Sequence, residues 1–329
     1  MSLNHSTRSS CFWFNIRRSL SNNTGVVAVC LIVLATFLTS GSFSRDIFKL
    51  TNVITILHHM VSLGLVSIGQ TFCILSGSFD LSVGSVISLT TLLFAGTVFG
   101  RPEMILPALL LVFGVGLAFG LINGLMIAKA RINPFVSTLA TMLMGQGASL
   151  MYNYGPYGKI TSGINYIGYG TVGPIPVAIL IFAAFFTAAL LVLTNTRFGL
   201  HVYALGGGIQ PARLSGVNTS RVRITAHVIC SLMATCTGIY FASRLGTGDP
   251  YVGIDVELES IAAVCIAGTS LFGGRGTLWG TLGGVLLLVM LSNAFNHLNV
   301  QTTIQLIARG LLIIVAVAVY TIRRKGFGC

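Results

Sequence analysis

The chain of 329 residues is 54% hydrophobic and only 8% charged, with a mean hydropathy of +0.88. Soluble globular domains carry about 25% charged residues, so this composition excludes a soluble domain and indicates a polytopic membrane protein. The formal net charge of +12 arises from basic residues at the ends of apolar runs. Membrane topology explains that placement better than a nucleic-acid partner does, and we predict no nucleic-acid binding.

Inside a bilayer the chain must satisfy its own backbone polar groups, so only helices and closed barrels span it. The apolar runs have the length of helices, which predicts an all-α fold. We expect about ten membrane-spanning helices, at residues 25–40, 52–76, 82–99, 104–128, 133–151, 173–193, 224–243, 260–272, 277–294 and 303–322. Residues 1–24 are predicted to be a cytoplasmic tail with an interfacial aromatic segment, because no signal-peptide cleavage pattern is present.

The second predicted span is unusually polar and contains His58, His59 and Gln70. Polar groups are expensive against lipid, so we expect them to face protein or a water-filled path. The two histidines are adjacent and point to different faces, which makes them a poor metal pair, and we expect a packed or pore-facing role. The seven cysteines form no CxxC pair and are interpreted as small buried hydrophobic residues. We predict no metal and no cofactor.

Residues 75–89 interrupt the apolar pattern between the second and third spans, because Gly77 and Gly84 flank Asp80 and serines follow it. Two interpretations of Asp80 are open. The first is contact with a transported solute. The second is a helix cap, in which the carboxylate accepts from the amide of Ser82 or Val83.

Small residues recur at one-turn spacing on two of the predicted spans. They are Gly116, Gly120 and Gly124 on the fourth span, and Gly276, Gly280 and Gly284 at the ninth. Small residues at this spacing let two helices approach closely. We therefore expect each of these spans to pack tightly against a neighbouring helix.

Residues 195–223 form a basic stretch that separates two long apolar regions. It carries no acidic residue and four arginines, Arg197, Arg213, Arg221 and Arg223. Within it, a short helix is predicted from Pro211 to Ser215, with proline at the first helical position and Gly216 just past the end. Such a helix between membrane spans is typical of a docking surface for a cytosolic partner. The alternative is an ordinary positive-inside loop that binds nothing.

Ten spans place both termini on one side of the membrane, and the basic residues decide which side. Thirteen of them lie on the side of the termini, against five on the other side, which also holds six acidic residues. The positive-inside rule therefore places both termini and residues 195–223 in the cytoplasm. We expect a first transmembrane half at 25–194, the cytoplasmic loop 195–223, a second transmembrane half at 224–322 and a cytoplasmic tail at 323–329.

Two short segments resemble each other across the chain. Residues 79–85 (FDLSVGS) match residues 254–260 (IDVELES), and 99–101 (FGR) match 273–275 (GGR) at nearly the same offset. Because each half would contain five spans, the halves would cross the bilayer in opposite directions. Inverted repeats of this kind place a transport path at their interface, beside interrupted helices. The sequence therefore predicts two inverted five-helix halves.

Three segments, GSFDLSVGS (77–85), YALGGGIQPARLSGVNTSRVRI (203–224) and ELESIAAVCIAGTSLFGGRGTLWGTLGG (257–284), resemble the ribose/xylose-type permease subunits of bacterial ATP-binding cassette (ABC) importers. The similarity extends over nearly the whole chain in the right order. The chain departs from the family's usual residues at Gly208, Pro211 and Ala267. These departures put the identity of the substrate more in doubt than the function.

The resemblance implies a permease subunit that dimerises in the bacterial inner membrane and is embedded in the lipid bilayer. It implies a cytosolic ATP-binding subunit on the inner face and a periplasmic solute-binding protein on the outer face. The family's coupling helix corresponds here to Ala212, Arg213, Leu214, Ser215 and Gly216, to which Pro211 and Arg197 are added as neighbours. No phosphate-binding loop occurs in the sequence, so ATP would be hydrolysed by the partner.

We predict that movement of the coupling helix switches the side to which a central path opens. The residues expected to border that path are Gln70, Asp80, Ser82, Gly84, Ser85, Gly273 and Gly274. The predicted substrate is a small, sugar-like solute, and a pentose, a hexose, an autoinducer-type furanose and a nucleoside all stay open. The sequence also leaves open whether the permease forms a homodimer or a heterodimer. The acidic segment 249–259 is either a contact for the binding protein or a solvated loop.

Two other function classes compete with this interpretation. A stand-alone secondary transporter or channel also suits inverted repeats and broken helices, but the spans hold few ionisable groups for a coupling ion. An integral-membrane enzyme lacks any nucleophile–base or metal constellation in the sequence. A permease that is not itself an enzyme is therefore the preferred prediction.

Overall fold

The computed structural model describes residues 49–266, 268–301, 303–308, 310 and 311. Its elements are α3 (Leu50–Leu75), α4 (Val83–Val98), η2 (Pro102–Met104), α5 (Ile105–Ala128), α6 (Pro134–Tyr152), α7 (Ser162–Tyr169), β1 (Thr171–Val172), β2 (Ile175–Pro176), α8 (Val177–Asn195), α9 (Arg197–Gly207), α10 (Ile209–Leu214), α11 (Thr219–Leu245), α12 (Val256–Ile266) and α13 (Leu278–His297). The all-α prediction is confirmed for these residues, in which the only strands are β1 and β2. They have two residues each and pair as one antiparallel hairpin.

Five helical segments of the described chain are long and apolar enough to cross a membrane. They are Leu50–Leu75, Pro102–Ala128, Val177–Asn195, Thr219–Leu245 and Leu278–His297, and the apolar α4 is shorter. The predicted span at 25–40 and most of the one at 303–322 lie outside the described residues. Ten spans and the inverted repeat therefore stay predictions.

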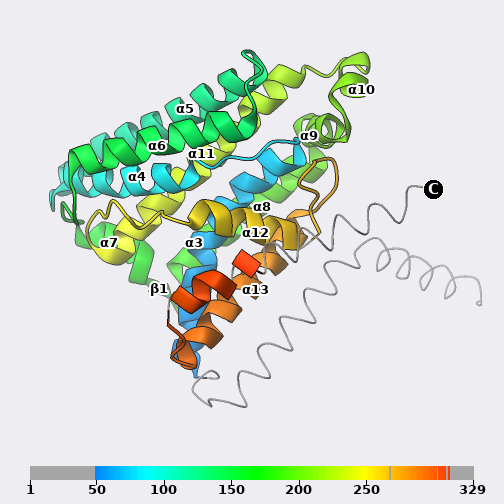
Figure 1. The fold of residues 1–329 in the computed structure, drawn as a ribbon. Helices are drawn as coiled ribbons and strands as arrows, with labels where there is room; N and C mark the ends of the chain where they lie inside the picture. The colour runs from blue at the N-terminus through cyan, green and yellow to red at the C-terminus, as the bar shows by residue number, and fades with distance from the viewer. Residues whose placement is uncertain (1–48, 267, 302, 309, 312–329) are drawn as a thin grey trace, which may run out of the picture.

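Helix α11 lies at the centre of the fold and packs against α5, α3 and α4 (Figure 1). The predicted close approach is confirmed for α5, where Gly120 lies against the backbone of His227 and Val228 and Gly124 lies against Ile224. A methyl group at either glycine would overlap the backbone of α11. The small-residue spacing thus sets the distance between the two helices.

Polar residues of α3 are turned toward protein, as their cost against lipid requires. Ser67, Gln70 and Thr71 are fully buried, and Thr71 Oγ1 lies 2.9 Å from Thr281 Oγ1 of α13. On the other side, α3 contributes Ile68 and Phe72 to the largest apolar cluster, which also takes side chains from α8 and α11. Helix α3 therefore connects the α4–α5–α6–α11 group with α12 and α13.

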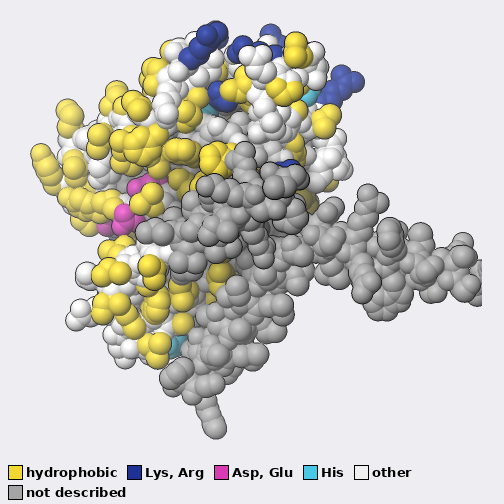
Figure 2. All heavy atoms as spheres, turned by 45° about the vertical axis from the view of Figure 1, so that its right-hand side comes forward, with side chains coloured by type: hydrophobic (Ala, Val, Ile, Leu, Met, Phe, Trp, Pro, Cys, Tyr) yellow, Lys and Arg dark blue, Asp and Glu magenta, His cyan; other side chains and the backbone are white. Residues whose placement is uncertain are grey.

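The two ends of the helix group differ in charge. Helices α9 and α10 lie at one end, and α7 with the β1–β2 hairpin lies toward the other (Figure 1). Lys and Arg side chains gather at the α10 end, whereas the visible acidic side chains lie lower in the molecule (Figure 2). On the face drawn in Figure 2, basic side chains are therefore concentrated at one end of the helix group, and the assignment of that end to the cytoplasm stays a prediction.

Several element boundaries differ from those predicted. Most of 195–223 is helical, since α9 and α10 fill it and α11 begins at Thr219, five residues before the predicted start. Helix α12 covers Val256–Ile266 instead of 260–272. It begins earlier because Glu257 and Glu259 lie in its first turn, where negative charge stabilises a helix. The two segments proposed as a repeat are in contact, with Gly84 packed against Gly253 and Glu257.

Candidate functional site

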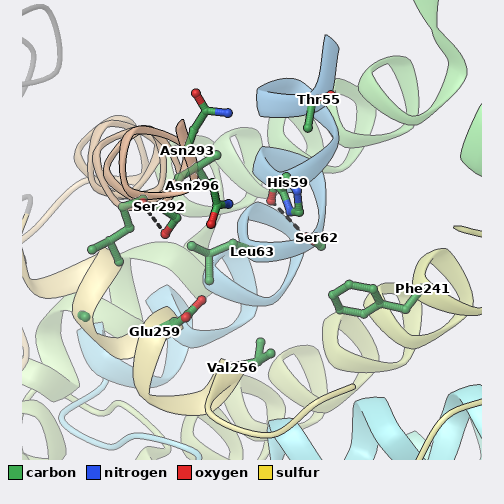
Figure 3. Close-up of a pocket in the computed structure, with 13 residues that line it drawn as sticks. Thr55, His59, Ser62, Leu63, Phe241, Val256, Glu259, Ser292, Asn293 and Asn296 are labelled. Carbon is green, nitrogen blue, oxygen red and sulfur yellow. Dashed lines mark hydrogen bonds between the residues drawn. The ribbon is translucent and has the colours of Figure 1, made fainter. Parts of the chain in front are cut away.

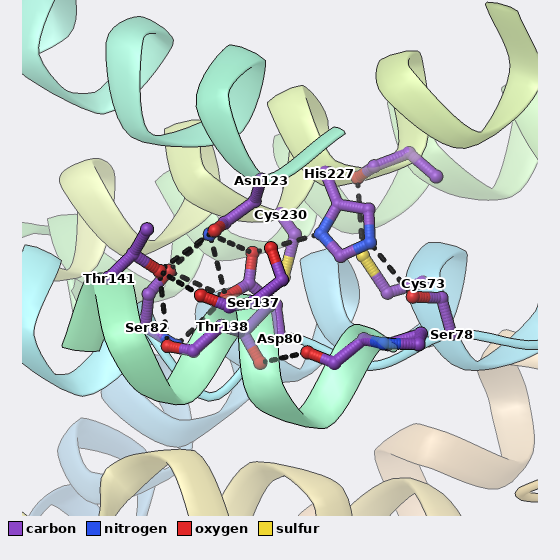
Figure 4. A network of polar contacts seen from close by, with 12 residues as sticks. Cys73, Ser78, Asp80, Ser82, Asn123, Ser137, Thr138, Thr141, His227 and Cys230 are labelled. Carbon is purple, nitrogen blue, oxygen red and sulfur yellow. Dashed lines mark hydrogen bonds and ion pairs between the residues drawn. The ribbon is translucent and has the colours of Figure 1, made fainter. Parts of the chain in front are cut away.

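A buried acid–base pair lies between the segment that precedes α4 and the middle of α11. Asp80 Oδ2 is 3.1 Å from His227 Nδ1, and both side chains are fully inaccessible to solvent. The other ring nitrogen of His227, Nε2, lies 2.9 Å from Ser78 Oγ. A proton on Nδ1 bonds the carboxylate, and Nε2 then exchanges a hydrogen bond with the serine hydroxyl. Both ring nitrogens are satisfied by residues of one short segment (Figure 4).

The second oxygen of the carboxylate is satisfied locally. Asp80 Oδ1 accepts from the Ser82 amide at 2.8 Å and from the Ser82 hydroxyl at 2.6 Å. The predicted bond from the Ser82 amide to the Asp80 carboxylate is therefore present. The prediction that Asp80 is the helix cap is wrong, because Ser82 occupies the N-cap position of α4. Bonds of this type close a turn and fix the entry of the chain into a helix.

Asn123 of α5 extends this network to α6. Its Nδ2 donates to Ser82 Oγ at 2.9 Å, and its Oδ1 accepts from Thr141 Oγ1 at 2.8 Å. On the other side, Gln70 of α3 donates to the backbone oxygen of Asp80 at 3.2 Å. The network therefore joins α3, α5, α6 and α11 around one carboxylate (Figure 4). Satisfied buried networks make the arrangement of their helices specific.

The residues predicted to border a path fall into two groups. Gln70, Asp80, Ser82 and Ser85 belong to or adjoin the buried network, and Ser85 Oγ donates to the Ser82 backbone oxygen at 2.9 Å. Gly273 and Gly274 lie in a separate turn, and Gly84 packs against α12. In this conformation the predicted path residues between positions 70 and 85 are buried, whereas Gly273 and Gly274 are partly exposed. Contact of any of them with a solute stays a prediction.

Three glycine-containing turns meet where α9 ends. Gly206 lies directly against the Leu75 backbone oxygen and the Gly274 amide, and Gly273 lies against Gly77. The Gly274 amide donates to the Leu75 oxygen at 3.0 Å. Tyr203 of α9 adds a bond from its hydroxyl to the Gly276 oxygen at 3.0 Å. Helix α9 is thus held against both the turn after α3 and the turn before α13.

A cavity of about 220 Å³ lies between α3, α11, α12 and α13. Its polar lining consists of hydroxyl, amide, imidazole and carboxyl groups, and apolar side chains complete the wall. The lining residues are Thr55, His59, Ser62, Leu63, Phe241, Val256, Glu259, Ala262, Leu288, Val289, Ser292, Asn293 and Asn296. Figure 3 shows His59 and Ser62 of α3 opposite Ser292 and Asn296 of α13, with Glu259 of α12 below.

Sequence reasoning missed this cavity and predicted only part of its wall. The sequence indicated the polar character of the second span. The two adjacent histidines point to different faces of the helix, as expected. His59 lines the cavity, whereas His58 is packed with its Nδ1 3.0 Å from the Tyr240 hydroxyl. The polar residues Ser292, Asn293 and Asn296 near the end of α13 were the remaining signal. Asn296 lies about one turn after both Ser292 and Asn293, which places the three on one side of the helix.

Helix α10 is the short basic helix predicted within 195–223, although it begins earlier than expected. It starts at Ile209, so Pro211 occupies the third position instead of the first; its missing amide hydrogen is still one of the four that lack a partner in a helix. Gly216 follows the end as predicted, with φ +80°. The Val217 amide bonds the Ala212 oxygen at 3.0 Å, which is the Schellman arrangement.

The side chains of α10 divide into anchoring and exposed groups. Ala212 is buried against the fold, whereas Leu214 is 89% exposed. Arg213, also exposed, donates from its Nε to Thr219 Oγ1 at 3.2 Å. Arg197 is exposed at the first position of α9. An apolar side chain and a basic side chain are therefore presented at the tip of the molecule. Within the described chain, no group of three or more His, Cys, Asp or Glu side chains is placed to hold a metal ion.

A family model described as "Branched-chain amino acid transport system / permease component" matches residues 52–317. The ribose import permease protein RbsC of Haemophilus influenzae is 34% identical over 313 residues, which cover 92% of this chain and 94% of that protein. RbsC of Bacillus subtilis is 37% identical over 271 residues, covering 81% and 83%. The L-arabinose transport system permease protein AraH of Escherichia coli is 35% identical over 263 residues, covering 77% of each chain. No solved structure matches significantly.

The buried pair gives a direct test of the network. Replacing one partner (Asp80→Asn or His227→Gln) should lower stability by about 3–5 kcal/mol, because the remaining group loses its partner in a low-dielectric interior. The double variant should lose less than the sum of the two single variants. Thermal unfolding of the detergent-purified protein measures all three. Strictly additive losses would contradict an energetic coupling between the two side chains.

Proposed function

This chain belongs to the family described as "Branched-chain amino acid transport system / permease component", and we propose that it is the membrane-spanning permease subunit of a binding-protein-dependent ABC importer for a monosaccharide. The observation that carries the proposal is the 34% identity to a ribose import permease over 92% of the chain. The L-arabinose permease relative supports a sugar over an amino acid as the solute.

The proposed assembly contains a second permease subunit, a cytosolic ATP-binding subunit and a periplasmic solute-binding protein. It lies in the bacterial inner membrane with both termini in the cytoplasm. The separation of basic and acidic side chains between the ends of the helix group supports this orientation (Figure 2), because cytoplasmic loops carry an excess of Lys and Arg. In this orientation α10 faces the cytoplasm and the acidic segment before α12 faces the periplasm.

We assign coupling to α10 and the two residues after it, with Pro211, Arg213, Leu214, Ser215 and Gly216 at the contact and Arg197 beside it. The buried Ala212 anchors this segment to the fold. The exposed Leu214 and Arg213 fit an interface that combines an apolar anchor with a basic group. Because α10 continues from α9, a shift of α10 also moves Gly206 and Tyr203. These residues contact the turns at 75–77 and 273–276. Motion at the cytoplasmic end therefore has a physical route to both interrupted segments.

The cavity between α3 and α13 is the proposed place of the solute in this conformation. Hydroxyl and amide groups such as those of Ser62 and Asn296 exchange hydrogen bonds with sugar hydroxyls, and Phe241 offers an apolar face. Importers need only weak contacts along the path, since the binding protein selects the solute. The buried residues around Asp80 and the turn at Gly273 would border the path once the helices beneath the cavity move apart.

Transport itself is the first test. Vesicles that contain the permease, its ATP-binding subunit and its binding protein should accumulate ribose or L-arabinose only when ATP is supplied. Ser62→Val and Asn296→Leu should each reduce uptake about five- to tenfold, because each removes about one hydrogen bond between the cavity wall and the solute. Both variants should retain the ATP-binding subunit. Uphill uptake by the chain without nucleotide or partners would instead identify a secondary transporter.

Docking through α10 is tested by reversing one charge. Arg213→Glu should lower co-purification of the ATP-binding subunit by at least about tenfold, since an interfacial charge then repels its counterpart. Arg221→Glu is the matched control, because Arg221 lies in the same basic region but not on α10. Equal retention of the ATP-binding subunit by both variants would remove α10 from the interface.

The route through α9 is tested by two neighbouring glycines. A methyl group at Gly206 would overlap the backbone at Leu75 and Gly274, whereas one at Gly207 would meet nothing within 4 Å. Gly206→Ala should therefore cut ATP-driven uptake by about tenfold while the ATP-binding subunit still binds, since the packed turns must shift to admit the methyl group. Gly207→Ala should transport normally. Equal uptake by the two variants would rule out this contact as the coupling route.

A further inference from the structure

A second cavity, of about 370 Å³, lies beside α10 at the end of the molecule where basic side chains gather. It is enclosed by the end of α5, the start of α6, α10 and the start of α11. Its lining residues are Ile127, Ala128, Arg131, Ile132, Asn133, Pro134, Ile209, Arg213, Thr219, Ser220 and Arg223. Three arginines therefore face one cavity, and none of the acidic residues in the described chain lines it.

The arginines lack a compensating negative charge among the described residues. Arg223 is half-buried at the start of α11, and its Nε is buried without a hydrogen-bond partner in that part of the chain. Arg213 makes one bond, to the neutral hydroxyl of Thr219. Like charges held together around a partly buried space are unfavourable unless an anion joins them. The cavity thus has the electrostatics of an anion site.

The turn that carries Arg131 also fits this function. Helix α5 ends at Ala128, and the chain then turns back so that the Ile132 amide bonds the Met126 oxygen at 3.1 Å. Within this turn Arg131 has φ +57°, a left-handed conformation that favours glycine. This conformation costs backbone free energy for a residue other than glycine, and the Arg131 side chain lines the cavity.

The surroundings of the cavity indicate where the anion comes from. The cavity lies where the apolar α5 ends and α6 begins, which is the level of lipid headgroups for helices that cross a membrane. Ile132, Phe135 and Val136 beside it are 38%, 50% and 57% exposed. These apolar side chains suit acyl chains, whereas a site for a free cytosolic anion has no need of them.

We propose that this cavity binds the phosphodiester headgroup of an anionic membrane lipid. Its phosphate oxygens accept hydrogen bonds from Arg131 and Arg223, and its acyl chains lie along Ile132 and Phe135. Arg213, assigned above to docking, adds positive charge to the same cavity. Guanidinium groups suit this task because their planar donors match phosphate oxygens in pairs. Basic pockets between transmembrane helices on the cytoplasmic side are known lipid headgroup sites. A bound lipid would hold α10 against the start of α6.

The test measures lipid retention by the purified full-length chain in native mass spectrometry, with phosphatidylglycerol and phosphatidylcholine as probes. Phosphatidylglycerol should bind about tenfold more tightly than phosphatidylcholine, and Arg131→Gln and Arg223→Gln should each reduce that preference at least about fivefold. Arg221→Gln is the control for loss of one positive charge, because Arg221 does not line the cavity. It should retain the wild-type preference.

Three outcomes would overturn the proposal. The first is equal retention of phosphatidylglycerol by the wild type and the three variants. The second is displacement of the lipid by inorganic phosphate at equal concentration, which would identify a free anion as the ligand. The third is a loss of the ATP-binding subunit in Arg131→Gln and Arg223→Gln without a change in lipid binding. That result would identify a carboxylate of the partner as the occupant.

Discussion

A carboxylate buried within a membrane-spanning helix group must be paired, and here Asp80 and His227 meet this requirement for each other. An isolated charge would be too costly at this depth, so the segment at 76–82 must lie where the Asp80 carboxylate reaches His227 of α11. The glycines of α5 bring Asn123 close enough to join the same network. The placement of four helices thus follows from the satisfaction of one side chain.

Such a pair gives specificity more than stability. Apolar residues of similar volume often stabilise a buried position as well as an ion pair does, so the value of Asp80 lies in excluding other arrangements of the segment before α4. A one-residue shift of this segment would separate the carboxylate from His227 and expose the helix start. In a protein whose interrupted segments are proposed to move, a network with one satisfied arrangement gives a defined resting state.

The sequence allowed some of this to be predicted and not the rest, for identifiable reasons. The long apolar runs and the glycine spacing on α5 predicted helices and a close contact, because both depend on local periodicity. The bond from the Ser82 amide to Asp80 is also local. The ion pair was missed because His227 is 147 residues away, although it is an ionisable residue within an apolar run. The cavity beside α3 was missed because its wall comes from four helices, and no local pattern records which faces meet.

The distribution of contacts separates a fixed part of the molecule from a part suited to movement. Around Asp80 the helices are joined by side-chain hydrogen bonds that would have to break together. Between α9 and the turns at 75–77 and 273–276, contact is largely backbone against glycine, with the Tyr203 hydroxyl as an added bond. Glycine surfaces can slide without changing rotamers, yet they transmit displacement because no side chain lies between them to absorb it. If α10 moves as proposed, α9 therefore offers a contact to the interrupted segments that does not pass through the Asp80 network. The cavity lined by Ser62 and Asn296, the proposed place of the solute, is formed by α3, α11, α12 and α13, so a change in the spacing of these helices would change its size.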